Sequence, residues 1–232
     1  MTISLRKISA VFQSNLTRIT RDMMMLLNFA MGPLMVFLVT LNVPYDATYE
    51  DGNGVLAQMI MFSILFSPLA TIGMLIADEK EKQTLSSLIA ATVTKTEFLI
   101  ANTLITLSLL LLSNMAIFFI IPLHNIPLTF VLAVSIIGAI PPLCLGASLG
   151  IIAKSLKSAS VILAIVPLFL FFLPQLIRDT LSDYLQYLFT HQIVMIIFYQ
   201  TIELENLLIL ATNTLVFLVL FMVFYKKKGF ES

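Results

Sequence analysis

Few residues in this sequence have the types and spacing that catalysis or metal binding requires. The two histidines, His124 and His191, lie far apart, and neither has a second ligand at the spacing that metal sites use. The single cysteine, Cys144, excludes an intrachain disulfide. No serine–histidine–aspartate set, metal site or carboxylate pair can be assembled at one level of the molecule. We therefore expect no active site and no cofactor in this chain.

The densest run of ionisable residues is Asp78-Glu79-Lys80-Glu81-Lys82. Its carboxylates need an explanation, because the C-terminus of a helix favours cations by about 0.3–1 kcal/mol per charge. Two interpretations are open. The carboxylates are solvated and neutralised by the neighbouring lysines, or they recognise a cytoplasmic protein that carries basic residues. Composition alone favours neither.

This charged run begins a polar segment that ends at Glu97, between two apolar stretches that are each long enough to span a bilayer. Thr94-x-x-Glu97 is a capping-box pattern and predicts that a new helix begins there. A helix in the preceding part would carry one apolar stripe, formed at spacings of three and four by Leu85, Leu88, Ile89 and Val93. The pattern predicts an amphipathic helix lying at a membrane face.

The composition is that of an integral membrane protein. The 232 residues are 59% apolar and 11% charged, which is too little polar surface for a water-soluble globule. A membrane-spanning helix needs about 20 mostly apolar residues. The sequence predicts one all-α domain over residues 1–232, with six spans at 23–41, 55–77, 98–121, 128–153, 159–177 and 205–225.

Basic residues are divided unequally between the two sides that six spans define. Both termini share a side with every lysine and arginine except Arg178. Since basic residues near span ends remain cytoplasmic, we expect both termini in the cytoplasm. No charged residue lies in the middle of a predicted span, where proton- and ion-coupled transporters place their coupling groups. The chain therefore lacks an evident energy source of its own.

Two further segments are predicted to lie in or near the membrane surface. Residues 1–22 have apolar side chains at helical spacing, with basic residues on the other faces, as in a helix of the headgroup layer. The region between Arg178 and Glu205 is apolar enough to enter the membrane, but a seventh span would move the C-terminal lysines outside. We expect a re-entrant pair of half-helices, broken near Thr190-His191-Gln192.

Small polar residues occur on single faces of the second and third spans. They either line a translocation path or form hydrogen bonds between helices, each worth about 0.6–2 kcal/mol, and we favour the second interpretation. The residues that could line a path are Ser63, Ser67, Thr71, Thr106 and Asn114.

The fourth span contains two patterns that predict backbone geometry. Pro141-Pro142 should kink or break the helix. Gly146 and Gly150, four residues apart, permit the backbone of another helix to approach closely. The segment from Gly146 to Ser155 is not a nucleotide site, because no lysine directly follows the second glycine.

The polar segment resembles the one that follows the second span in type-2 ATP-binding-cassette (ABC) exporter permeases. Their pattern is Glu-x-Glu-x-Gly-Thr-Leu, then Leu-Leu-Ala-Thr-Pro-Val-Ser-Arg-x-Glu, then Gly-Lys. Here Gln83 replaces the first glycine, Thr92 the proline and Ala101-Asn102 the Gly-Lys, which indicates a divergent branch. The wider likeness covers the whole chain. The residues that fit are Glu79, Glu81, Thr84, Leu85, Leu88, Ile89, Ala90, Val93, Thr94, Lys95 and Glu97.

The resemblance implies a permease subunit of a bacterial cytoplasmic membrane, with an N-terminal interfacial (elbow) helix and a cytoplasmic coupling helix that docks on a separate ATPase. ATP and Mg²⁺ would bind that partner, so this chain would be a transport subunit and not an enzyme. Lys154 and Lys157 would form a second cytoplasmic contact. The expected contacts of the coupling helix are Asp78, Glu79, Glu81, Thr84, Leu85, Leu88, Ile89, Val93, Lys95 and Glu97.

The resemblance also implies a second permease copy, identical or homologous, besides membrane lipids and no nucleic acid. The apolar composition suggests an amphiphilic substrate such as a peptide, a lipid-like molecule or a drug. The alternative function is a non-transporting immunity or assembly factor that binds a partner within the bilayer.

Overall fold

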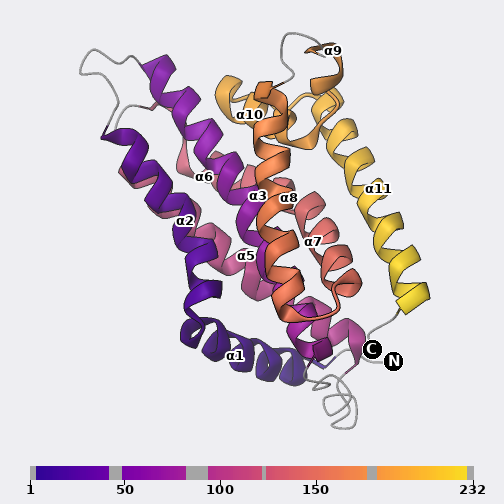
Figure 1. Cartoon of the computed structure of the whole chain (residues 1–232). Coiled ribbons are helices and arrows are strands. Elements are labelled where there is room, and N and C mark those ends of the chain that lie inside the picture. Colours follow the sequence, from indigo (N-terminus) through magenta and orange to yellow (C-terminus); the bar gives the residue numbers. More distant parts are fainter. Residues whose placement is uncertain (1–3, 42–48, 82–93, 122–123, 177–181, 229–232) are drawn as a thin grey trace.

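The computed structural model describes residues 4–41, 49–81, 94–121, 124–176 and 182–228, and all regular structure in them is helical (Figure 1). The all-α prediction is confirmed. The helices are α1 (Leu5–Arg21), α2 (Met23–Thr40), α3 (Tyr49–Glu81), α5 (Lys95–Ile120), α6 (Leu128–Gly138), α7 (Ile140–Ile152), α8 (Leu156–Leu176), α9 (Ser182–Leu185), α10 (Phe189–Tyr199) and α11 (Leu204–Lys228).

Among the described residues, four helical stretches are long and apolar enough to cross a membrane. They are Gly52–Glu81, Thr96–Ile120, Leu128–Ile152 and Leu204–Lys227. A fifth is obtained if α1 and α2, which are bent by 66° to each other, count as one broken span. The chain is therefore an integral multi-pass membrane protein. The prediction of six spans goes beyond this count, since the described apolar part of α8 is a shorter helix.

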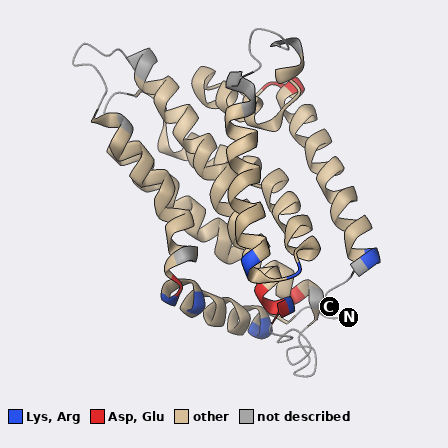
Figure 2. Ribbon diagram, viewed as in Figure 1, with Lys and Arg blue, Asp and Glu red and all other residues tan. Residues whose placement is uncertain are grey.

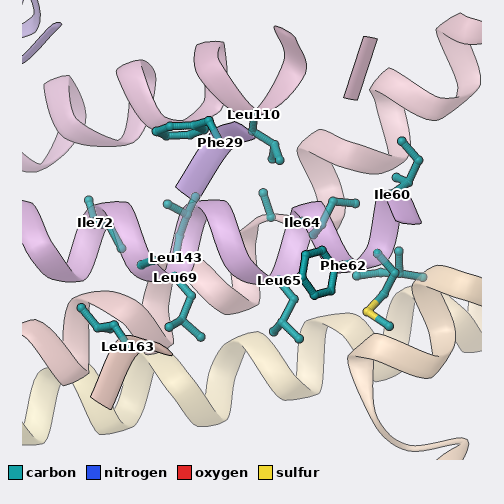
Figure 3. Packing of buried hydrophobic residues seen from close by; sticks show 14 of the residues in the cluster. Phe29, Ile60, Phe62, Ile64, Leu65, Leu69, Ile72, Leu110, Leu143 and Leu163 are labelled. Atoms are coloured by element: carbon teal, nitrogen blue, oxygen red, sulfur yellow. The ribbon is translucent and has the colours of Figure 1, made fainter. Parts of the chain in front are cut away.

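Helix α3 is the centre of the bundle. Nearly all of its membrane-length window is buried, as expected for a helix that is apolar on every side. Figure 3 shows Leu65, Leu69 and Ile72 of this helix packed among side chains from α2, α5, α7 and α8. A displacement of α3 must therefore displace most of its neighbours.

Helices α3 and α7 pack closely together, and glycines make this contact possible. A Cβ atom on Gly150 would lie 2.6 Å from the carbonyl oxygen of Gly73, and one on Gly73 would lie 2.8 Å from that of Gly146. The predicted close approach at Gly146 and Gly150 is confirmed. The predicted kink or break corresponds to an interruption of one residue, Ala139, between the end of α6 and the start of α7, and Pro141-Pro142 lies in the first turn of α7.

The break before the last helix lies elsewhere than predicted. Thr190 and Gln192 are buried in the first turn of α10, and the chain is instead non-helical at 186–188, between the single turn of α9 and α10. Of the polar residues that suggested a break, Gln192 bonds the backbone of the actual break. Gln192 donates to the carbonyl oxygen of Gln186, and Asn213 of α11 donates to that of Tyr187 at 2.9 Å.

Helix α1 crosses one end of the bundle (Figure 1). Its buried side chains, Ile8, Val11, Asn15 and Ile19, recur at spacings of three and four, which confirms an amphipathic helix. Leu5, the first residue of the helix, is 81% exposed although it is apolar.

Charged residues divide the bundle into two unlike ends. Figure 2 shows the described lysines and arginines gathered at the end that carries α1, while carboxylates occur at both ends. Lys82 and Arg178 lie outside the described residues. This distribution agrees with the asymmetry on which the predicted orientation depends. Exposed cations at the α1 end include Arg6, Arg21, Lys154, Lys157, Lys226 and Lys227.

Candidate functional site

The candidate site is the charged C-terminal end of α3. The second span was predicted to end at residue 77, but α3 continues to Glu81 and takes the acidic residues with it. Asp78 and Glu79 are only 2% and 5% exposed. For these two carboxylates the solvated interpretation is therefore wrong, whereas Glu81 is exposed. Buried carboxylates require a partner inside the protein, because an unpaired buried charge is costly.

That partner is Arg18 of α1. Its guanidinium forms an ion pair with Asp78 and another with Glu79, whose Oε1 lies 2.5 Å from the arginine Nη1. A planar guanidinium with five N–H donors is well suited to hold two carboxylates at once. The first half of the acidic run is thus engaged within the chain.

The remaining charges of the run bind the connection between α7 and α8. The Lys80 ammonium donates to the carbonyl oxygens of Ile151 at 3.0 Å and Ala153 at 3.2 Å, at the C-terminus of α7. Glu81 Oε2 accepts a hydrogen bond from the backbone N–H of Leu156, the first residue of α8, at 2.5 Å. The cation of Lys80 thus lies at the C-terminus of α7, and the anion of Glu81 lies at the N-terminus of α8. Both charges interact favourably with the helix dipoles.

We expect Lys80→Met to loosen the α7–α8 connection. Methionine keeps the apolar stem but leaves the carbonyl groups of Ile151 and Ala153 without a charged donor, at a cost of about 1.5–3 kcal/mol. Hydrogen–deuterium exchange should rise in peptides covering 151–158 and not in α10. Lys157→Met, which removes an exposed lysine from the same region, is the control. Equal exchange in the two variants would contradict the role assigned to Lys80.

Glu97 fixes the start of α5 and also the start of α1. The predicted capping box is confirmed, since Glu97 N donates to Thr94 Oγ1 at 3.2 Å and Thr94 N donates to Glu97 Oε2 at 2.8 Å. The other carboxylate oxygen of Glu97 accepts from Ser4 N at 2.8 Å. Helix α1 is therefore attached near both ends, to α5 through Ser4 and to α3 through Arg18.

The structure brings the second expected cytoplasmic contact next to the first. Lys154 and Lys157 are exposed and flank Leu156, whose N–H is bound by Glu81. Lys95 begins α5, and its side chain lies outside the described residues. The other expected coupling-helix contacts also lie outside them: Thr84, Leu85, Leu88, Ile89 and Val93.

The residues that could line a path are instead inside the bundle, all with 0% exposure: Ser63, Ser67, Thr71, Thr106 and Asn114. Three of them contact other helices. Ser67 Oγ donates to the carbonyl oxygen of Asn28 at 3.0 Å, Asn114 donates to Ser135 Oγ at 2.8 Å, and Ser63 Oγ lies 3.4 Å from that of Ser113. These three contacts agree with hydrogen bonding between helices, the interpretation favoured above, whereas the buried hydroxyls of Thr71 and Thr106 make no hydrogen bond within the described residues. The lining of a path stays a prediction.

Arg18 and the capping role of Lys80 were missed by the sequence reasoning. Arg18 was recognised only as a basic residue on another face of an amphipathic helix. Its spacing from Ile19 and Asn15 places it at the edge of the buried face, but the sequence does not show which residues lie opposite. Among the described residues, no group of three or more His, Cys, Asp or Glu could hold a metal ion.

No family model matches this chain, and no curated protein is detectably similar to it. What the site can do must therefore be argued from its own contacts. Those contacts make the α3 terminus a junction of α1, α3, α7 and α8.

Proposed function

We propose that this chain is the permease subunit of an ABC exporter and receives work from a separate ATPase. The observation that supports this best is the junction at the end of α3. The segment expected to dock on the ATPase, residues 78–97, begins in this junction, and its first residues bind α1 and the α7–α8 connection. A force applied there would be passed to several helices at once.

In this proposal α3 acts as a rigid lever. It is 33 residues long, is buried along nearly its whole membrane-length window, and is held at its inner end by charged contacts. The described outer end is held by hydrogen bonds between neutral groups, such as Asn53 Nδ2 to Asn125 Oδ1 at 2.8 Å. If the inner end of α3 moves together with the helices that it binds, the hydrogen bonds between neutral groups at the outer end would rearrange to permit that movement.

The remaining parts of the proposal follow from the family resemblance and from the distribution of charge. The chain would have six spans with both termini in the cytoplasm and would act with a second permease copy. ATP and Mg²⁺ would bind the ATPase subunit and not this chain. The apolar bundle favours an amphiphilic substrate, such as a peptide, a lipid-like molecule or a drug.

The test reverses charges that are exposed. Glu79 is unsuitable, because it is buried against Arg18 and its reversal would disturb the fold. We expect Lys154→Glu with Lys157→Glu to lower co-purification of the ATPase subunit about tenfold or more, since charge reversal turns attraction into repulsion. An acidic residue in the first turn of α8 favours that helix, so folding should be preserved.

The matched control is Lys226→Glu with Lys227→Glu, which reverses two exposed lysines at the end of α11. Co-purification should be unchanged in the control. If no ATPase accompanies the unmodified chain, or if reconstituted membranes show no substrate-stimulated ATP hydrolysis, the exporter proposal is wrong. An immunity or assembly factor would then be the better description.

A further inference from the structure

Two buried threonine hydroxyls inside the bundle are not hydrogen-bonded to any described residue. Thr71 of α3 and Thr106 of α5 are both 0% exposed, and neither Oγ1 atom has a partner in the described part of the chain. A threonine hydroxyl in a helix can donate to the carbonyl oxygen four residues earlier, as those of Thr212 and Thr214 in α11 do at 2.8 Å. Because an unpaired buried hydroxyl is costly, the two exceptions point to a ligand.

The two hydroxyls lie at the same level of the bundle. Helices α3 and α5 are antiparallel, since the end of α3 and the start of α5 are both bonded to α1 or to its N-cap. Ser63 Oγ of α3 lies 3.4 Å from Ser113 Oγ of α5. Thr71 is eight residues from Ser63 and Thr106 is seven from Ser113, so they lie about 12 Å and about 10.5 Å from this contact, toward the α1 end.

Both hydroxyls also face the same helices. Thr106 shares a face of α5 with Ser113, seven residues away, and Ser113 Oγ donates to a backbone carbonyl oxygen of α2 at 2.8 Å. Thr71 shares a face of α3 with Ser67, four residues away, and Ser67 Oγ donates to another backbone carbonyl oxygen of α2 at 3.0 Å. The hydroxyls of Thr71 and Thr106 therefore face the region where α2, α3 and α5 meet.

A third polar atom of this kind is Asn102 Nδ2, one helical turn from Thr106 on α5. Asn102 is 0% exposed, and its Oδ1 accepts a hydrogen bond from Asn15 of α1 at 2.5 Å. Its Nδ2 has no partner among the described residues. Side chains four residues apart on a helix have their Cβ atoms about 5–6 Å apart. Two hydrogen bonds of about 2.8 Å, through one small molecule, can span that distance.

The chemistry of the three atoms selects the ligand. All three groups are neutral, so none of them compensates the charge of a buried ion, and the amide Nδ2 is only a donor. Complete burial restricts the ligand to a small molecule. Water accepts from the amide and exchanges hydrogen bonds with two hydroxyls, and about three partners is typical of buried water. We propose that one buried water molecule bridges Thr71, Thr106 and Asn102.

Such a water would connect three helices inside the bundle. The hydrogen bond from Asn15 to Asn102 already joins α1 to α5, and the water would extend this connection to α3. Helix α3 would then be linked to α1 by a second route, besides the ion pairs of Arg18. This inference does not depend on the proposed function.

The direct test is a crystal structure of the full, unmodified chain grown in a lipid mesophase, at about 2 Å resolution. We expect a density peak at about 2.7–3.2 Å from Thr71 Oγ1, Thr106 Oγ1 and Asn102 Nδ2. If no peak lies there while other buried waters are seen, the proposal is overturned. This result requires no variant, so a folding defect cannot protect the proposal.

The second test measures the unfolding temperature in detergent. Thr71→Val and Thr106→Val nearly keep the shape of the side chain but remove a partner of the water, so each should lower the unfolding temperature. The double variant should lower it by less than the sum, because both hydroxyls bind one molecule. Thr212→Val is the control, since its exposed hydroxyl bonds within α11, and it should have little effect.

Three outcomes of this second test would contradict the proposal. A rise in either single variant would show that its hydroxyl is unpaired, because valine then removes a costly buried polar group. Additive decreases would show that the two hydroxyls do not share a ligand. An equal decrease in Thr212→Val would show a general effect of valine in these helices.

Discussion

Gly146→Ala is expected to destabilise the protein although it adds one methyl group. The new Cβ would lie 2.8 Å from the Cα atom of Leu69 and 2.7 Å from Cγ2 of Ile72. The first of these atoms is backbone and cannot rotate aside, so α3 and α7 must separate. Overpacking of this kind costs about 1–3 kcal/mol and sometimes more. Because α3 packs against most of the bundle, we expect the unfolding temperature in detergent to fall clearly, as measured by fluorescence-detected size-exclusion chromatography.

The same substitution at Gly54 is the matched control. Gly54 also lies in α3, but its Cβ would meet only Phe198 at 3.7 Å, an ordinary van der Waals distance. Alanine is favoured over glycine within a helix by roughly 0.5–1 kcal/mol. Gly54→Ala should therefore leave the unfolding temperature unchanged or raise it. A similar decrease in both variants would show that the glycine contact does not limit the approach of α3 and α7.

The features that the sequence predicted correctly are local or repetitive. The capping box depends on residues three apart, Thr94 and Glu97, whose hydrogen bonds form within one helical turn. The long apolar runs predicted the all-α fold, because a segment in the bilayer interior must satisfy its own backbone hydrogen bonds and a helix does so. Gly146 and Gly150 predicted a close helix contact because only small residues permit one. The sequence did not show which helix would fill it.

The features that it missed depend on contacts between distant residues. Arg18 and Glu79 are separated by 61 positions, and no spacing rule connects them. The hydropathy pattern predicted that the second span ends before Asp78. Helix α3 continues to Glu81 because its charges are satisfied by Arg18 and by the α7–α8 connection. Gln192 suggested a break, yet its side chain bonds the backbone of the actual break and receives a bond from Asn206 at 2.5 Å. A polar residue in an apolar run has more than one use, and tertiary contacts decide among them.

Removal of Arg18 is expected to lower the stability of the protein more than Gly146→Ala does. Arg18→Gln removes the guanidinium that pairs with both Asp78 and Glu79, while both carboxylates remain buried. Loss of one partner from a buried ion pair costs about 3–5 kcal/mol. The arginine side chain is 22% exposed, so solvent screening places the expected loss of unfolding free energy toward the lower end, about 3 kcal/mol. Thermal denaturation of the purified chain in detergent measures it.

Two further variants separate the charge pairing from the packing of α1. Arg21→Gln removes an exposed arginine one turn along the same helix, outside these ion pairs, and should leave stability nearly unchanged. Adding Asp78→Asn and Glu79→Gln to Arg18→Gln should restore most of the lost stability, because neutral amides do not need the cation. If the triple variant is as unstable as Arg18→Gln, the arginine contributes through its packed stem. If Arg18→Gln alone is as stable as Arg21→Gln, the end of α3 is not fastened to α1, and a force applied at Glu81 would not reach that helix by this route.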